Sequence, residues 1–314
     1  MNFMGLIKIR FISLVCCFVL FSTAGQAASL SYELTPRLIA KDTWLLQGKL
    51  EDFSRDNGAN IVNTAFIVTS EGVVVIDTGP SKRYAQAFRR AIATVTDKPV
   101  TDVFITHHHP DHFLGNQAFA DVNIWALPTT GRLIAEQGDA FAENMYRLAG
   151  DWMRGTEVLM PNKPLEQTAM SIGGHRFTFL SLVGHTGADL AILDETTGTL
   201  FAGDLVFYQR ALTTPHTPGI DQWLADLDRL DAVGAKLIVP GHGPVDSDGK
   251  AILQMRAYLA WLDKTLTQAA HHGLSMNEVM KIATEPEFAD IALSQYEFIR
   301  TVFHLYAGYE EAAF

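Results

Sequence analysis

Hydrophobic and polar positions divide the chain into short continuous apolar runs and longer stretches with helical spacing. In the first half, strands are expected at Thr43–Lys49, Asn60–Thr69, Val73–Ile76, Val100–Ile105 and Ile124–Trp125. Val73–Ile76 is apolar at every position, which is typical of a strand that is buried on both faces. Tyr84, Phe88 and Ile92 recur four residues apart. This spacing predicts a helix over 81–94, and a second helix is expected over 129–152.

The second half repeats this organisation. Strands are expected at Phe177–Val183, Leu190–Asp194, Thr199–Ala202 and Leu237–Val239, and helical stripes run through 220–230 and 252–266. Ser275 and Glu278 have the spacing of a capping box that opens another helix. Strands in both halves, with helices between and after them, predict an α/β protein in which two sheets pack face to face under helices. We expect this domain at 28–246 and a C-terminal helical extension that packs on it at 247–314.

The N-terminus has the pattern of a secretory signal. Lys8 and Arg10 precede the apolar run Phe11–Phe21, and Gly25–Ala27 offers small residues for cleavage. A signal peptide at 1–27 predicts a periplasmic or secreted protein without a stable membrane anchor after cleavage. An uncleaved anchor is the alternative, but the apolar run is short for a bilayer span.

Composition narrows the functional classes. The 314 residues are 48% hydrophobic, which is enough to bury a sizeable core. Both cysteines, Cys16 and Cys17, lie in the predicted signal, so the mature chain would have neither a disulfide nor a thiolate ligand. Loss of Lys8 and Arg10 with the signal would shift the formal charge from -11 to -13. Such acidity disfavours binding to nucleic acid.

The run Thr106–His112 concentrates potential metal ligands directly after a predicted strand. It reads His-x-His-x-Asp-His, offering His107 and His109 to one metal and Asp111 and His112 to a neighbouring metal. Imidazole and carboxylate suit Zn²⁺, and Fe or Mn less specifically. A surface His-rich tract is the plain alternative. The position at a strand end favours the metal site, because α/β sheets bind ligands at that edge.

Three further pairs add ligand types: Gly184-His185, Gly203-Asp204 and Gly241-His242. In each, we expect a strand to end, a glycine to turn the chain and the next side chain to point to a shared centre. A single Gly-His pair would be weak evidence. The three pairs together with the His107 run predict one composite metal centre.

This ordered set resembles the metallo-β-lactamase superfamily over roughly residues 40–250. The resemblance implies an αββα sandwich with the metals at one edge of the two sheets. It assigns His107, His109 and His185 to the first metal, Asp111, His112 and His242 to the second, and Asp204 to a bridge between them.

Such a centre implies hydrolysis of a small-molecule substrate. Two Zn²⁺ ions about 3.5–4 Å apart would share a hydroxide that attacks a carbonyl-type group. Asp111 and Asp204 would orient this nucleophile and are the expected catalytic residues. Asp77 either aims a ligand histidine or is an ordinary strand-end turn residue. His108 is expected to point away from the metals.

Longer strings resemble a narrower group, the quinoprotein relay system zinc metallohydrolases. They are Asn60–Thr64, Val74–Ser81, His107–Phe119, Gly203–Phe207 and Arg210–His216. This resemblance implies an exported protein with a periplasmic quinoprotein dehydrogenase as a possible partner, and it gives no substrate. Asp204 stands where some antibiotic-degrading members have cysteine, so the chain looks more like glyoxalase II and the general hydrolases. The basic patch of glyoxalase II has no convincing counterpart after Ala251.

Arg210 and His216 follow Asp204 in a proline-containing loop, and either could face a substrate. Arg210 could hold a carboxylate by two parallel hydrogen bonds. The alternative is a surface salt bridge and a solvated histidine. Three other functions stay open: a β-lactamase-like or glyoxalase II-like thioesterase, a mononuclear iron persulfide dioxygenase, and a non-catalytic periplasmic accessory protein.

Overall fold

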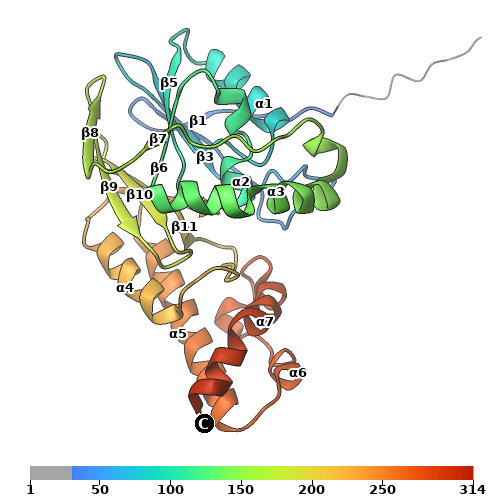
Figure 1. The fold of residues 1–314 in the computed structure, drawn as a ribbon. Helices are drawn as coiled ribbons and strands as arrows, with labels where there is room; N and C mark the ends of the chain where they lie inside the picture. The colour runs from blue at the N-terminus through green and yellow to red at the C-terminus, as the bar shows by residue number, and fades with distance from the viewer. Residues whose placement is uncertain (1–29, 314) are drawn as a thin grey trace, which may run out of the picture. The chain divides into compact units, whose positions relative to one another are not determined.

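A computed structural model describes residues 30–313 of the chain. The predicted signal at 1–27 lies outside the described residues. From Ser31 onward the chain forms one compact unit of two β-sheets and flanking helices. Figure 1 shows α1 to α3 on one side of the sheets and α4 to α7 on the other.

The first sheet has seven strands in sequential order. They are β1 (Arg37–Ala40), β2 (Thr43–Leu46), β3 (Thr64–Val68), β4 (Val73–Ile76), β5 (Val100–Phe104), β6 (Asn123–Ala126) and β7 (Lys163–Pro164). β1 to β4 pair antiparallel, whereas β4 to β7 pair parallel. Parallel neighbours need a crossover, and helix α1 (Lys82–Ala93) provides the one between β4 and β5.

The second sheet has five strands in the order β12-β11-β10-β9-β8. They are β8 (Ala169–Ile172), β9 (His175–Leu182), β10 (Asp189–Asp194), β11 (Thr199–Phe207) and β12 (Leu237–His242). All neighbours are antiparallel except β11 and β12. Their parallel pairing follows from the crossover through α4 (Ile220–Asp231).

The other helices start and stop where local chemistry permits. They are α2 (Pro110–Phe113), α3 (Pro128–Ala149), α5 (Lys250–His271), α6 (Met276–Val279) and α7 (Ser294–Ala313), with 3₁₀ turns at Asn116–Phe119, Gly150–Met153 and Pro286–Phe288. The Ser81 hydroxyl accepts from the Tyr84 N–H and caps α1. The predicted capping box of Ser275 and Glu278 opens α6.

Three apolar layers build the αββα sandwich, which confirms the predicted fold class. β4 illustrates why its sequence does not alternate: Val74 and Ile76 face the second sheet, while Val73 and Val75 face the helices of the first. A strand covered on both sides needs apolar residues at every position. The two sheets therefore hold their edges rigidly together, and the ligands come from those edges.

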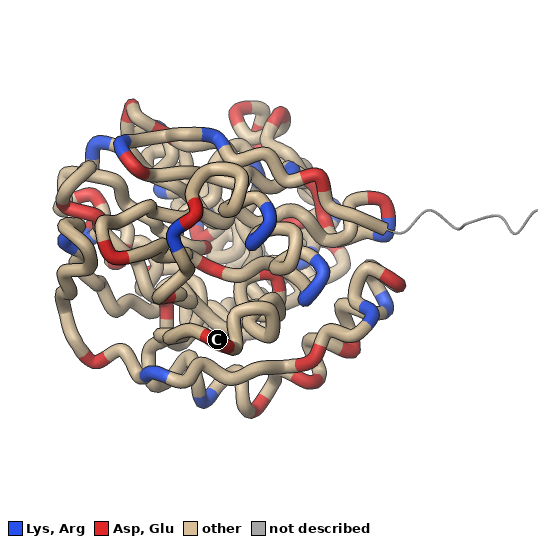
Figure 2. Tube along the Cα trace, turned by 90° about the horizontal axis from the view of Figure 1, so that it is seen from above, with Lys and Arg blue, Asp and Glu red and all other residues tan. Residues whose placement is uncertain are grey.

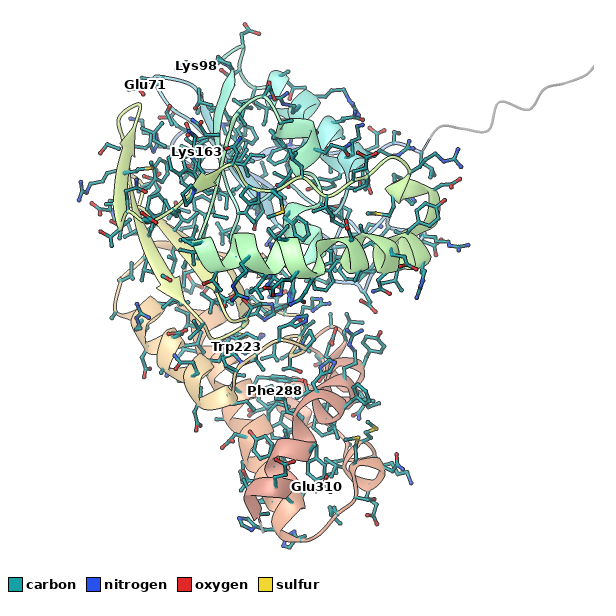
Figure 3. The ribbon with its side chains drawn as sticks, viewed as in Figure 1. Glu71, Lys98, Lys163, Trp223, Phe288 and Glu310 are labelled. Atoms are coloured by element: carbon teal, nitrogen blue, oxygen red, sulfur yellow. The ribbon has the colours of Figure 1, made fainter. Side chains whose placement is uncertain are left out.

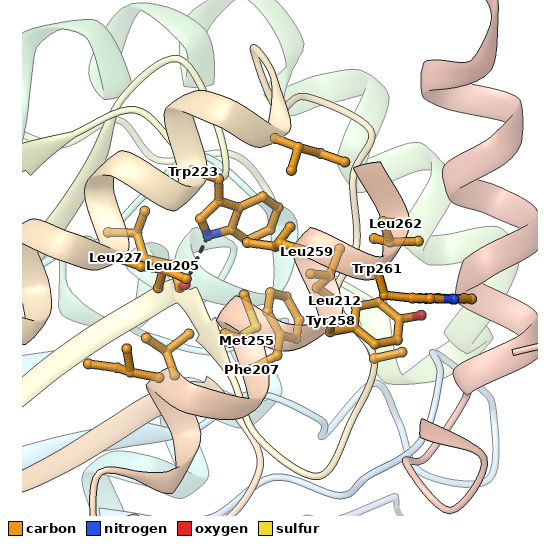
Figure 4. Close-up of a cluster of buried hydrophobic side chains, with 14 of the residues drawn as sticks. Leu205, Phe207, Leu212, Trp223, Leu227, Met255, Tyr258, Leu259, Trp261 and Leu262 are labelled. Atoms are coloured by element: carbon orange, nitrogen blue, oxygen red, sulfur yellow. Dashed lines mark hydrogen bonds between the residues drawn. The ribbon is translucent and has the colours of Figure 1, made fainter. Parts of the chain in front are cut away.

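The third apolar layer lies between the second sheet and the C-terminal helices. Trp223 of α4 is fully buried there, and its indole N–H donates to the Leu205 carbonyl at 2.9 Å (Figure 4). Phe288, labelled with Trp223 in Figure 3, packs against Tyr258 of α5. Phe298 of α7 belongs to the same cluster. The C-terminal helices thus share a core with the second sheet.

Two strands are longer than the sequence pattern predicts. β11 continues to Phe207 and β12 to His242. Gly203 and Gly241 therefore lie inside strands, and the expectation that a strand ends before each of them was wrong. The pairing of β11 with β12 shifts register around Gly203, whose φ is +52°. A bulge of this kind re-aims side chains without ending the ladder.

The surface carries mixed charge. Among the described residues, Lys and Arg are interspersed with Asp and Glu along the trace seen in Figure 2. No helix within 30–313 combines the length and the apolar character needed to cross a bilayer.

Candidate metal centre

Seven predicted ligands from distant parts of the chain converge at one edge of the sandwich. They are His107, His109, Asp111, His112, His185, Asp204 and His242, and all are buried. The first four follow β5, one follows β9, and the last two lie in β11 and β12. The two sheets thus bring together residues that are separated by up to 135 positions.

A first group consists of His107, His109, His185 and Asp204. One ligand atom from each lies within 4.8 Å of the others. His185 Nε2 is 2.9 Å from His109 Nδ1 and 3.4 Å from Asp204 Oδ2. Three nitrogens and one carboxylate oxygen around one point match the ligand set that zinc prefers.

A second group consists of Asp111, His112 and His242. Asp111 Oδ2 is 3.3 Å from His242 Nε2 and 3.7 Å from His112 Nε2. Asp204 reaches this group too: its Oδ1 is 3.1 Å from His112 Nε2 and its Oδ2 is 3.3 Å from His242 Nε2. The Asp204 carboxylate therefore lies between the two groups.

Gly241 makes this position of Asp204 possible. A Cβ atom at residue 241 would lie 1.9 Å from Asp204 Oδ1 and 2.8 Å from the backbone of Gly203. No side chain fits that space, so only glycine lets β12 approach β11 at the centre.

Asp77 fixes the orientation of His112. Its Oδ2 accepts from His112 Nδ1 at 2.7 Å and from the Thr106 hydroxyl at 2.8 Å, and its Oδ1 accepts from the Thr106 N–H at 2.8 Å. The Ile61 carbonyl holds His242 in the same way, 2.9 Å from Nδ1. With Nδ1 engaged, Nε2 of each imidazole points at the centre. Of the two interpretations of Asp77, the structure favours the positioning role.

Asp189 is a further supporting residue, and the sequence analysis missed it. Its carboxylate accepts from the N–H groups of His185 (2.9 Å) and Thr186 (2.7 Å) and from the Thr186 hydroxyl (2.7 Å). Burial raises the pKa of Asp189 to about 7 despite these hydrogen bonds. These contacts shape the turn that presents His185. The available signal was an acidic residue directly before the apolar run Leu190–Leu193.

The protonation state of the histidines in the first group favours a cation. Burial lowers the pKa of His107, His109 and His185, the last to about 3. These imidazoles are therefore neutral at pH 7, which is the form that binds metal. Burial also opposes protonation of His112 and His242, but the carboxylates of Asp204 and Asp111 outweigh it and raise their pKa values.

Unpartnered buried atoms point to the same use. Among the described residues, five atoms of the seven predicted ligands lack a hydrogen bond of acceptable geometry: His107 Nε2, Asp111 Oδ2, His112 Nε2, His185 Nδ1 and Asp204 Oδ1. Buried polar atoms are normally satisfied, and a cluster of exceptions calls for an explanation such as an ion. Imidazole nitrogens and carboxylate oxygens without thiolates fit Zn²⁺, Fe or Mn.

A cavity of about 240 Å³ opens on the centre and includes both predicted substrate residues in its lining. His216 Nδ1 is 2.8 Å from Nε2 of His109, so this nitrogen of His216 already contacts a predicted metal ligand. Arg210 is buried, and its guanidinium donates to the Ala211 carbonyl and pairs with Glu297. His108, which was expected to point away from the metals, belongs to neither of the two ligand groups and lies with His109 and His216 in a third cluster.

The family description "Metallo-beta-lactamase superfamily" matches residues 57–242 of this chain. The chain belongs to this superfamily. A linear primary-alkylsulfatase from Pseudomonas sp. (strain ATCC 19151) is 25% identical over 292 residues, covering 77% of this chain and 54% of its own length. Metallo-beta-lactamase IND-1 from Chryseobacterium indologenes is 28% identical over 189 residues, covering 57% of this chain and 71% of its own. The chain thus spans about half the length of the alkylsulfatase.

Solved structures share the fold. A metallo-beta-lactamase from Pontibacter korlensis superposes with a TM-score of 0.60 at 23% identity, over 73% of this chain and 99% of its own. A stereoselective inverting sec-alkylsulfatase from Pseudomonas sp. superposes with a TM-score of 0.67 at 17% identity, over 88% of this chain and 50% of its own. At these identities the likeness concerns the fold. The narrower resemblance to quinoprotein relay system metallohydrolases stays a prediction.

Proposed function

We propose that this protein is a metal-dependent hydrolase with two cations, zinc being the expected metal, that acts on a small molecule with a carbonyl-type electrophile. One observation carries the proposal: the Asp204 carboxylate lies between the two ligand groups, 3.1 Å from His112 Nε2 and 3.4 Å from His185 Nε2. A carboxylate in that position is the ligand that a two-metal site shares.

The two groups would hold one cation each, with Asp204 common to both. When bound, such cations lower the pKa of water and polarise the electrophile. The protein's own residues orient the ligand imidazoles. Asp77 accepts a hydrogen bond from His112 Nδ1, and the Ile61 carbonyl accepts one from His242 Nδ1. Asp111 would take part in holding the second cation and would orient the attacking water.

Sulfate-ester hydrolysis is the second candidate. The alkylsulfatase structure covers 88% of this chain, whereas the Pontibacter lactamase covers 73%. The additional coverage supports a relation that reaches beyond the sandwich into the C-terminal helices. A lactam or thioester substrate has no comparable support from that part of the chain.

We also propose that the protein is exported to the periplasm and that a quinoprotein dehydrogenase is its partner. Both rest on sequence, the first on the 1–27 pattern and the second on the strings around Asn60 and Gly203. Co-purification of the full chain with a dehydrogenase from its native periplasm would support the partner. A freely migrating chain in the same extract would oppose it.

Metal analysis and hydrolysis assays test the function. The purified mature chain should hold about two zinc ions and turn over at least one probe from a panel of lactams, thioesters and alkyl sulfates. Asp111→Asn should abolish turnover, whereas Asp194→Asn, a matched change beside the distant His175, should not. If the chain instead holds one iron and consumes oxygen in the presence of a persulfide, the protein is a dioxygenase and not a hydrolase. Two metals without turnover on any probe would favour the accessory role.

A further inference from the structure

Charged residues of the C-terminal helix form part of the cavity beside the candidate metal centre. The lining includes Asp111, Asp204 and His242, and it also includes Glu297 and Arg300 of α7. Nothing in the sequence pattern of α7 singles out these two residues. Their contacts show how they are organised.

Glu297 is buried between two arginines. Its Oε1 is 3.4 Å from Arg210 Nη2 and its Oε2 is 3.3 Å from Arg300 Nε. Glu297 and Arg210 are each only 2% exposed at the side chain. Burial raises the pKa of Glu297, although the charges of both arginines oppose that change. The carboxylate thus fixes one buried and one accessible guanidinium.

Within residues 30–313, two of the three Arg210 guanidinium nitrogens have partners in the protein, whereas the buried Nε has none. Besides the pair with Glu297, Nη1 donates to the Ala211 carbonyl at 2.8 Å. The guanidinium lies 5.6 Å from the ring centre of Phe207, and that ring stacks on His242 at 5.1 Å. Arg210 therefore connects α7 to the metal centre as a positioning residue.

Arg300 is the accessible cation of this group. Its side chain is 41% exposed, Nη1 donates to the Tyr296 hydroxyl at 3.1 Å, and Nε faces Glu297. Among the described residues, Nη2 has no hydrogen bond or ion pair. The Tyr296 hydroxyl donates to Asp52 at 2.7 Å, which holds that tyrosine in place. Arg300 thus presents a pre-oriented donor at the cavity.

The charge of the loaded cavity favours an anion. Arg210 and Arg300 are balanced by Glu297 and Asp52, so this group is neutral by itself. Two divalent cations would exceed the charge of Asp111 and Asp204 and leave the cavity net positive. The rest of the lining includes Phe53, Phe141, Met145 and Pro215. A cavity with apolar walls and an accessible arginine whose Nη2 is available to donate suits an amphipathic anion.

We propose that Arg300 is a specificity-determining residue that binds the carboxylate or sulfate oxygens of an organic monoanion, while the bond to be cleaved lies at the metal centre. The substrate class is therefore an anionic ester, thioester or sulfate ester with an apolar body. The cleavage of this bond at the metal centre rests on the proposed function. The contact between Arg300 and the anion does not, because binding requires no turnover.

The test separates binding from hydrolysis. Pentanoate and the isosteric but neutral pentanamide are titrated by calorimetry into the zinc-loaded chain. Pentanoate should bind more tightly than pentanamide to wild type, and Arg300→Gln should weaken pentanoate at least about fivefold, since a charge-assisted hydrogen bond is lost. Arg300→Lys should be intermediate, because it keeps the charge without the planar fork. Arg132→Gln makes the same change at an exposed arginine of α3 and should bind as wild type does.

Kinetics supplies the second arm. The metal-loaded chain is assayed with 4-nitrophenyl hydrogen succinate and with its neutral methyl ester. Arg300→Gln should raise KM about tenfold for the anionic ester and less than twofold for the neutral one. Equal pentanoate affinity in wild type and Arg300→Gln would overturn the proposal, as would equal effects on both esters. If no probe is hydrolysed, the proposed function fails, and the pentanoate titration still decides the role of Arg300.

Discussion

Asp77→Asn isolates the contribution of one supporting residue to the metal centre. Asp77 has a φ of +57°, in the left-handed region where asparagine is tolerated and alanine adds strain. Asparagine also retains an oxygen that can accept from the Thr106 N–H. Its amide group would, however, present a donor to His112 Nδ1, which is itself the donor in the native pair.

The conflict changes the tautomer of His112. If Nδ1 loses its proton to accept from the amide, Nε2 gains one and can no longer bind a cation. Loss of such a supporting partner typically costs about 10- to 100-fold in metal affinity, equivalent to about 1.4–2.8 kcal/mol. The effect should fall on the second group, because His112 belongs to it and not to the first.

Zinc titration of the chelator-treated chain against a chromophoric competitor measures both sites. For Asp77→Asn we expect one site to weaken about 10- to 100-fold and the other to change less than about threefold. Asp194→Asn is the control, because Asp194 holds His175 Nδ1 at 2.9 Å in a comparably buried pair away from the centre. If both sites of Asp77→Asn bind zinc with wild-type affinity, Asp77 does not set the tautomer of His112.

Three further predictions concern packing and burial. Gly241→Ala would place a Cβ 1.9 Å from Asp204 Oδ1. We therefore expect zinc titration to show loss of binding and urea unfolding to show a destabilisation of about 3 kcal/mol or more. A variant as stable as wild type would contradict the close approach. Trp223→Phe leaves the Leu205 carbonyl without its donor and should cost about 2–4 kcal/mol in the same unfolding assay. Burial raises the pKa of Tyr32 to about 12. Its contribution to the free energy of unfolding is therefore complete below pH 10 and is lost as the pH rises to 12, and the difference between wild type and Tyr32→Phe should shrink over that interval.

Local sequence patterns predicted most of the strands and helices. Val73–Ile76 and the Tyr84–Phe88–Ile92 stripe both have the expected structure, because burial on two faces or on one helical face leaves a periodic signature. The edge strands β1 and β8 were missed. They are only four residues long and partly exposed, which is too short for an alternating pattern to be recognised.

The candidate site, too, was only partly predictable from local sequence patterns. The ligand types could be read from local motifs, because a histidine or aspartate beside a glycine is recognisable in the sequence. Their grouping depends on contacts between distant segments. Asn63, for example, donates to the carbonyls of Pro240 and Gly243, 177 and 180 residues away, and links β12 to the first sheet. The supporting contacts of Asp189 and the Glu297–Arg300 pair at the cavity were likewise invisible in the sequence. Such contacts depend on which elements pack together, and packing between distant segments leaves no local period to read.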